Sequence, residues 1–290
     1  MAESLPTPEA EDLARSVIDA AARGFVHGLG QRLESERLPP DDHRPWPAPR
    51  TPWLMAQVWD DLLFAHWAVR ASDLRPFVPP ALPVDTFDGS AWLAVTPFSV
   101  RGLRMRGLPA VPGISTFREI NVRTYVTIDG KPGVFFFSLD ADTLLGVQVA
   151  RLWFRLPYFY ASCKHDRADA FRFRSVRSHP DAPAAEFDGG YQPIGRPEAP
   201  TPGSLEWWLT ERYCFYVAFG DGRVERVEIH HAPWPLQRAE AELHTNTMAL
   251  PLDMRLARQP TTLHYARTLD VSIWGPEVIE ERRRCGTRAA

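Results

Sequence analysis

The sequence predicts a mainly β (α+β) fold, an antiparallel barrel or sandwich decorated by a few helices. Segments in which apolar and polar residues alternate recur along the chain, and tight Asp-Gly turns join two pairs of them. The 290 residues also include 28 prolines, about twice the usual ~5%. Because proline is excluded from helix interiors and central strands, this content indicates many corners between short elements. Many short strands joined by corners are typical of a barrel or a sandwich.

The charge and the apolar content exclude several classes of protein. Lys and Arg number 33 against 36 Asp and Glu, so the net charge of -3 excludes nucleic-acid binding through an overall positive charge. A hydrophobic content of 44% is typical of a folded globular protein. The first residues lack a secretory signal, and no run approaches the roughly 18 apolar residues that span a bilayer. We therefore expect a cytoplasmic protein with no nucleic-acid or membrane partner.

Residues 9–36 have the pattern of an amphipathic helix. Thr7 can cap it, Pro8 suits its first turn, and apolar residues recur every four positions. This stripe would dock on the body of the protein or pair two subunits, which leaves a homo-oligomer open. We predict three parts: a helical extension (residues 1–43), a barrel domain (44–278) and a polar tail (279–290).

Two hairpins are the clearest β-elements. Residues 120–128 alternate strictly, Asp129-Gly130 forms a tight turn, and residues 134–139 return as an apolar strand. The second hairpin joins 214–219 to 223–230 through a similar turn. Further strands are predicted at 56–66, 91–100, 158–165, 170–177 and 262–274, and helices at 141–154, 204–212 and 236–248. Six prolines between His179 and Gly203 predict a long loop there.

One face of the strand at 120–128 is polar and carries Asn121, Arg123, Tyr125 and Thr127. In an open sheet such a face contacts water. In a closed barrel it lines the interior, where an arginine and a tyrosine can bind an anionic ligand. Both interpretations stay open at this stage. Glu119, just before the strand, is either a reactive carboxylate or a member of an ion pair.

The histidines and cysteines give little support for metal or thiol chemistry. Adjacent His230 and His231 would point to opposite faces of a strand, and no zinc-ligand spacing accompanies His244, so we expect no metal. Cys163 and Cys214 are expected to be unreactive thiols in the core. Nucleotide-binding and serine-hydrolase motifs are absent, and we expect no cofactor.

Several longer segments resemble one family. They are Trp59–Trp67, Asp85–Trp92, Glu119–Val126, Gly133–Asp140, Leu156–Tyr158, Leu209–Tyr213 and His230–Leu236. Together they are similar to the YqjF-like family of bacterial proteins, in the acetoacetate-decarboxylase-like superfamily, from about Arg44 to Trp274. The resemblance implies a curved antiparallel β-barrel that encloses a small-molecule pocket.

The resemblance also bears on the chemistry. Acetoacetate decarboxylases use a barrel lysine that forms a Schiff base with a keto acid, and a second lysine lowers its pKa. Phe154 and Arg155 stand where the two lysines would be. Phenylalanine has no amine to form an imine, so the resemblance does not extend to decarboxylation. The chain has two lysines, Lys131 and Lys164, and either is left as an alternative nucleophile.

These observations predict a barrel protein that binds a small organic acid or carbonyl compound. The predicted catalytic residues are Glu119 and Glu211, as acid or base. Arg123 is the first predicted residue to bind a ligand carboxylate, and Arg155 is the second. The other predicted substrate-binding residues are Asn121, Tyr125, Tyr158 and His66. The alternative for His66 is a partly buried imidazole whose hydrogen bonds are satisfied within the protein. Three functions stay open: a lyase or isomerase that uses no Schiff base, a non-catalytic ligand-binding or sensor protein, and a structural or interaction protein.

Overall fold

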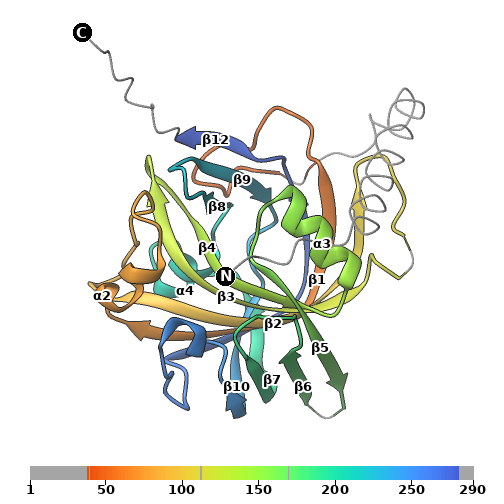
Figure 1. Ribbon diagram of the computed structural model, residues 1–290, viewed down its shortest axis with the longest axis vertical. Coiled ribbons are helices and arrows are strands. Elements are labelled where there is room, and N and C mark those ends of the chain that lie inside the picture. Colours follow the sequence, from red (N-terminus) through yellow and green to blue (C-terminus); the bar gives the residue numbers. More distant parts are fainter. Residues whose placement is uncertain (1–37, 39, 112, 169, 281–290) are drawn as a thin grey trace.

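The computed structural model describes residues 38, 40–111, 113–168 and 170–280 (Figure 1). The helix predicted at 9–36 and most of the tail predicted at 279–290 lie outside these residues. Within them the chain is mostly strand with few helices, which confirms the predicted mainly β class. No helix among the described residues is both long and apolar enough to cross a membrane.

Twelve strands pair into one continuous sheet in the described part of the chain. In sheet order they are β12 (Glu277–Glu280), β9 (Val224–His230), β8 (Cys214–Ala218), β4 (Lys131–Ala141), β3 (Phe117–Ile128), β2 (Ala91–Met105), β1 (Met55–Val69), β11 (Thr262–Ile273), β10 (Leu236–Asn246), β7 (Glu186–Glu198), β6 (Phe171–Arg177) and β5 (Tyr158–Arg167). Most neighbours are antiparallel, as predicted, whereas β4 pairs in parallel with β5 and with β8.

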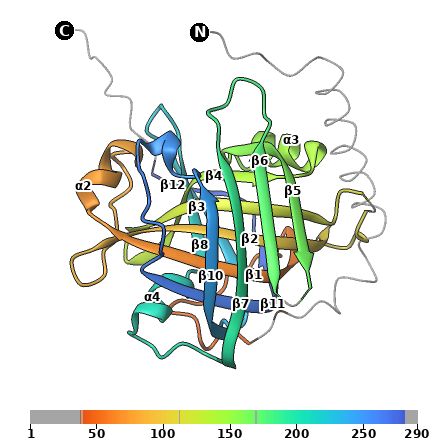
Figure 2. The same cartoon turned by 90° about the horizontal axis from the view of Figure 1, so that it is seen from below.

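The sheet closes on itself in two places. Ser272 and Ile273 of β11 pair with β9, and residues 139–141 of β4 pair with β5. The first closure makes a ring of seven strands and the second a ring of nine, and β1 to β4 and β11 belong to both rings. Figure 2 shows β5, β6, β7 and β10 crossing the face of β1, β2 and β3. The shared strands therefore have protein on both faces.

Burial on both faces decides between the two interpretations of β3. Its apolar residues, among them Ile120 and Val122, pack inside the nine-stranded ring. The alternate residues Glu119, Asn121 and Arg123 lie on the opposite face, and all three are buried. The polar face of this strand therefore looks into the seven-stranded ring and not into water.

The helices are short and lie between strands. α3 (Leu144–Trp153) begins after Thr143, whose hydroxyl accepts a hydrogen bond from the Gly146 N–H at 3.2 Å. α4 (Leu205–Thr210) begins after Ser204 in the same way. Both elements confirm helices that the sequence predicts. The other described helices are α2 (Ala71–Leu74) and two 3₁₀ turns, Arg75–Phe77 and Leu250–Leu252.

The prediction of a helix at 236–248 is wrong, because this segment forms β10. Its Ala and Glu residues favour a helix in isolation, yet they also alternate, so that Ala239, Ala241 and Leu243 share one face. Pairing with β7 and β11 selects the strand, since strand preference depends on neighbours more than on intrinsic propensity.

The prediction of a long loop at 179–203 is also wrong, because β7 occupies the centre of this segment. β6 pairs with β7 only as far as Tyr191, so Pro193 and Pro197 lie on a stretch that pairs with β10 alone. Proline is tolerated on such an edge, where its missing N–H interrupts no ladder. Nearer the centre, a Cβ at Gly189 would meet the Leu243 side chain at 2.8 Å, so a larger residue here would require that side chain to shift.

A buried ion pair lies at the seam between β4 and β5. Arg177 of β6 donates two hydrogen bonds to the Asp140 carboxylate, at 2.6 and 2.7 Å, and the two side chains are 2% and 1% exposed. The guanidinium of Arg177 also lies 4.1 Å from the ring centroid of Phe159, the strand partner of Asp140. The pair therefore stabilises the closure of the nine-stranded ring.

Arg177→Met is expected to lower the free energy of unfolding by about 3–5 kcal/mol, because the Asp140 carboxylate would remain buried without its partner. Denaturation in guanidinium chloride measures the loss. Arg70→Met is the matched control, because Arg70 pairs with Asp73 at the surface, where an ion pair contributes up to about 1 kcal/mol. Equal losses in the two variants would contradict the role assigned to the buried pair.

Candidate functional site

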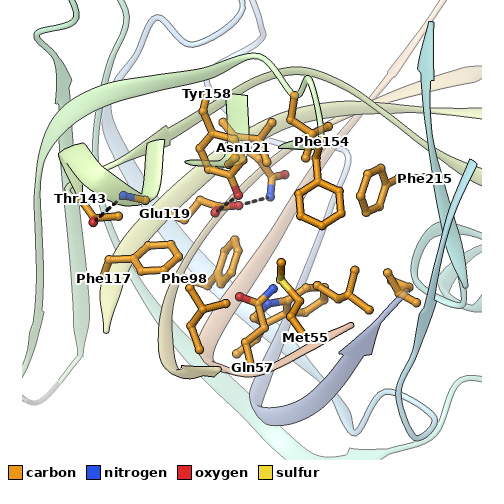
Figure 3. A pocket seen from close by; sticks show the side chains of 18 of the residues that line it. Met55, Gln57, Phe98, Phe117, Glu119, Asn121, Thr143, Phe154, Tyr158 and Phe215 are labelled. Atoms are coloured by element: carbon orange, nitrogen blue, oxygen red, sulfur yellow. Dashed lines mark hydrogen bonds between the residues drawn. The ribbon is translucent and has the colours of Figure 1, made fainter. Parts of the chain in front are cut away.

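A cavity of about 430 Å³ lies inside the seven-stranded ring. Side chains from all seven strands line it, and Leu145 of α3 together with Leu108 and Ile114 completes its wall. The wall is mostly apolar and contains many aromatic rings, among them Trp59, Phe98, Phe117, Phe136, Phe154 and Phe215 (Figure 3). A mostly apolar cavity of this size with a few polar groups is typical of a small-molecule site.

Glu119 is the acidic residue in the cavity wall. Its Oε2 accepts a hydrogen bond from the Tyr158 hydroxyl at 2.8 Å, and its Oε1 accepts one from Nδ2 of Asn121 at 3.4 Å (Figure 3). Burial raises the pKa of Glu119 to about 7, although both hydrogen bonds act in the opposite direction. Burial and the neighbouring carboxyl group raise the pKa of Tyr158 well above its usual value, so its hydroxyl remains a donor.

Arg123 places a positive charge on the same face of β3. The residue is 8% exposed, and its guanidinium lies 5.2 Å from the ring centroid of Phe64. Its Nε has no hydrogen-bond partner, and no ion pair joins it to a carboxylate of the described residues. Its charge lowers the pKa of Glu119, but by less than burial raises it. A buried guanidinium without a paired anion favours an anionic ligand.

Three of the predicted binding residues do not line the cavity. The Tyr125 hydroxyl and Nε2 of His66 form a hydrogen bond of 2.6 Å in the core. Burial lowers the pKa of His66 well below its usual value, so the neutral ring is the form that pairs with Tyr125. Arg155 is exposed at a turn with a left-handed backbone (φ 53°), so it points away from the interior.

Glu211, the second predicted catalytic carboxylate, does not line the cavity either. It accepts hydrogen bonds from the Tyr213 hydroxyl and, at 2.9 Å, from the Trp234 N–H. Burial raises its pKa, and these two hydrogen bonds oppose that rise. Glu211 therefore holds the turn that leads into β10.

Neither lysine of the chain reaches the cavity. Nζ of Lys131 lies 3.4 Å from Glu228 and 5.3 Å from the ring centroid of Trp46. Lys164 is exposed on β5. The ring of Phe154, at a position where the resemblance would place a lysine, forms part of the wall. The cavity therefore has no lysine amine to form an imine.

Sequence reasoning did not select Thr96 and Arg212, which both line the cavity. Thr96 is the register partner of Asn121, and the alternation of the strand predicted at 91–100 could have found it. Arg212 is buried and forms an ion pair with Asp85 at 2.8 Å, and no periodic pattern marks it in the sequence. No group of three metal-ligating side chains occurs among the described residues.

Comparison with known sequences places the chain in a family. The sequence profile of the DUF2071 family, whose description reads "uncharacterized conserved protein", matches residues 56–270. The chain is also 47% identical to the uncharacterized protein YqjF of Bacillus subtilis (strain 168) over 223 residues, which cover 77% of this chain and 91% of that protein.

Solved structures share the fold at low sequence identity. The enduracididine biosynthesis enzyme MppR, complexed with pyruvate, is 13% identical with a TM-score of 0.57, and the match covers 80% of this chain and 92% of that one. An acetoacetate decarboxylase-like enzyme from Sphingomonas wittichii RW1 is 15% identical with a TM-score of 0.54, covering 82% and 98%. The chain therefore belongs to the DUF2071 family and has the acetoacetate-decarboxylase-like fold that its sequence predicts.

Proposed function

We propose that the cavity binds a small organic acid or carbonyl compound, and that Glu119 transfers a proton on it without a Schiff base. One observation carries this proposal: a buried carboxylate with a pKa raised to about 7 faces an apolar cavity that also holds Arg123. A group with that pKa is an effective acid and base at neutral pH. The apolar wall strengthens its electrostatic contacts with a bound ligand.

In this proposal Arg123 binds the ligand and Glu119 transfers the proton. They are four residues apart on one face of β3, which separates their backbones by roughly 13 Å at about 3.3 Å per residue. The guanidinium can donate two parallel N–H groups to a ligand carboxylate. A ligand held in this way extends along β3, and its next carbon atoms approach Glu119.

Enolisation is the simplest reaction that this arrangement supports. The Glu119 carboxylate takes a proton from the carbon next to a carbonyl group. The C–H electron pair becomes the second bond of an enolate, and the carbonyl electron pair moves to oxygen, where the charge of Arg123 stabilises it. Protonated Glu119 then returns the proton, to the same carbon for exchange or to another atom for isomerisation. The cycle needs no lysine amine.

The structural relatives support the class of ligand. MppR is complexed with pyruvate, a 2-oxo acid. The Sphingomonas wittichii relative is an acetoacetate decarboxylase-like enzyme. Both share only the fold with this chain, so they support a small carbonyl acid as the ligand and leave the reaction to the residues of this cavity.

A non-catalytic ligand-binding protein is the second candidate. The mostly apolar wall, with one acidic residue and no lysine amine, is the observation that favours it. Both candidates use the same cavity and the same arginine. They differ in whether a bound 2-oxo acid loses and regains a proton.

In D2O the protein is expected to exchange the C3 protons of 2-oxo acids faster than buffer does, as followed by proton NMR with a panel of acids of different size. Glu119→Gln is expected to lower the exchange rate by about 10²- to 10⁴-fold, as the loss of a general base does. The wild-type rate should rise with pH and level off above about 7, because only ionised Glu119 accepts a proton.

Three variants serve as controls for this measurement. Glu242→Gln changes an exposed carboxylate on β10 and should leave the rate unchanged. Lys131→Arg and Lys164→Arg should do the same, because neither amine reaches the cavity. Loss of exchange in a lysine variant, or an adduct trapped by borohydride, would contradict a route without a Schiff base. Binding of 2-oxo acids with no exchange would favour the non-catalytic candidate.

Tyr158→Phe is expected to move the pH midpoint of exchange above about 7. The hydrogen bond from the Tyr158 hydroxyl lowers the pKa of Glu119, so its removal raises that pKa and delays ionisation. The pH profile of the exchange rate measures the midpoint. Tyr160→Phe, on the same strand but outside the cavity wall, is the control. A midpoint that stays or falls in Tyr158→Phe would show that this hydrogen bond does not set the pKa.

A further inference from the structure

The cavity is larger than a short keto acid requires. Its volume of about 430 Å³ lies in the range of about 300–1,000 Å³ that is typical of pockets for drug-sized ligands. A three-carbon acid such as pyruvate has six non-hydrogen atoms and would fill less than half of it. The remaining wall is apolar and aromatic, so water is a poor occupant of the rest. A ligand that suits this cavity therefore has an apolar body in addition to its acid group.

Among the side chains of β2 and β3 that line the cavity and are more than nine-tenths buried, three polar atoms lack partners within the described residues. They are Oγ1 of Thr96, Oδ1 of Asn121 and Nε of Arg123. Thr96 and Asn121 are register partners, so the three atoms belong to one patch of adjacent strands. Buried polar atoms without partners are costly, so a bound ligand is expected to supply the missing hydrogen bonds.

The chemistry of each atom says what it needs from the ligand. Nε of Arg123 is a donor and needs an acceptor. Nδ2 of Asn121 already donates to Glu119, which leaves its Oδ1 as an acceptor that needs a donor. The Thr96 hydroxyl serves in either role. The patch is thus complementary to a carboxylate next to a hydroxyl group, and less complementary to a carboxylate alone.

We infer that the cavity takes a 2-hydroxy acid, or the enol form of a 2-oxo acid, that carries an aromatic or branched apolar substituent. The carboxylate lies against Arg123, the hydroxyl donates to Oδ1 of Asn121, and the apolar body lies among the phenylalanine rings. This inference rests on the proposed function and names its ligand class. It also gives the enol a hydrogen bond that the keto form cannot make, so binding favours the enol that forms when protonated Glu119 returns its proton to the enolate oxygen.

Calorimetric titration of the full chain with three acids tests the inference. The probes are 3-phenyllactate, 3-phenylpropionate, which lacks the hydroxyl, and lactate, which lacks the ring. The affinity for 3-phenyllactate is expected to exceed that for lactate by at least about tenfold, because the ring buries apolar surface. It should exceed the affinity for 3-phenylpropionate by roughly three- to tenfold, the usual worth of one hydrogen bond.

Asn121→Leu provides the decisive comparison, because leucine is close to asparagine in size and accepts no hydrogen bond. This variant is expected to bind 3-phenyllactate and 3-phenylpropionate equally well. Each variant is its own control, since the ratio of two affinities is unaffected by a partial loss of folded protein. Thr96→Val preserves the β-branched shape and should bring the ratio of the 3-phenyllactate and 3-phenylpropionate affinities closer to one. This variant replaces Asn121→Leu in the test if Asn121→Leu does not fold.

The outcomes separate this inference from the proposed function. If lactate binds as tightly as 3-phenyllactate, the inference that the ligand carries an apolar substituent is wrong. If the two phenyl acids bind the wild type equally well, the inference that the ligand carries a hydroxyl group is wrong. Either result leaves the carboxylate site on Arg123 intact. If none of the three acids binds, or if Arg123→Met leaves their affinities unchanged, the proposed function itself fails.

Discussion

Burial of the shared strands on both faces is the constraint on which the rest of this structure depends. β1 to β4 and β11 belong to two rings at once, so neither face of β3 reaches water. Polar residues on such a strand lose their hydration and must find partners inside the protein. The same geometry that closes the fold therefore also sets the electrostatics of the cavity.

The cavity keeps its opposite charges apart. Glu119 receives hydrogen bonds from Tyr158 and Asn121, whereas Arg123 lies against the ring of Phe64. A close ion pair would hold the pKa of the carboxyl low and would satisfy the guanidinium. Separation leaves a carboxyl group with a pKa of about 7 and a cation without an anion. Each group is thus available to a ligand because it is not used by the other.

The sequence predicts the elements better than it predicts their surroundings. Strict alternation identifies β3 and puts Asn121 and Arg123 on one face, because the period of two is a local property of the strand. Whether that face meets water or a cavity depends on closure through β9 and β11, which joins residues far apart in the chain. Glu211 and Glu119 look alike in the sequence, yet one holds a turn and the other faces the cavity. The prediction of a helix in the segment that forms β10 is wrong for the same reason. Its Ala and Glu residues favour a helix in isolation, and only pairing with β7 selects the strand.

The likeness to acetoacetate decarboxylases separates fold from chemistry. The ring depends on strand pairing and apolar packing, and the fold is shared at 13–15% identity. Imine chemistry depends on one amine in the wall, and here Phe154 contributes a ring to the wall while Lys131 lies beside Glu228. What the wall retains is a carboxyl group that can exchange a proton near neutral pH and a buried guanidinium. In the proposed function, Arg123 supplies the positive charge that an imine would supply to the substrate, so the enolate is stabilised without a lysine amine.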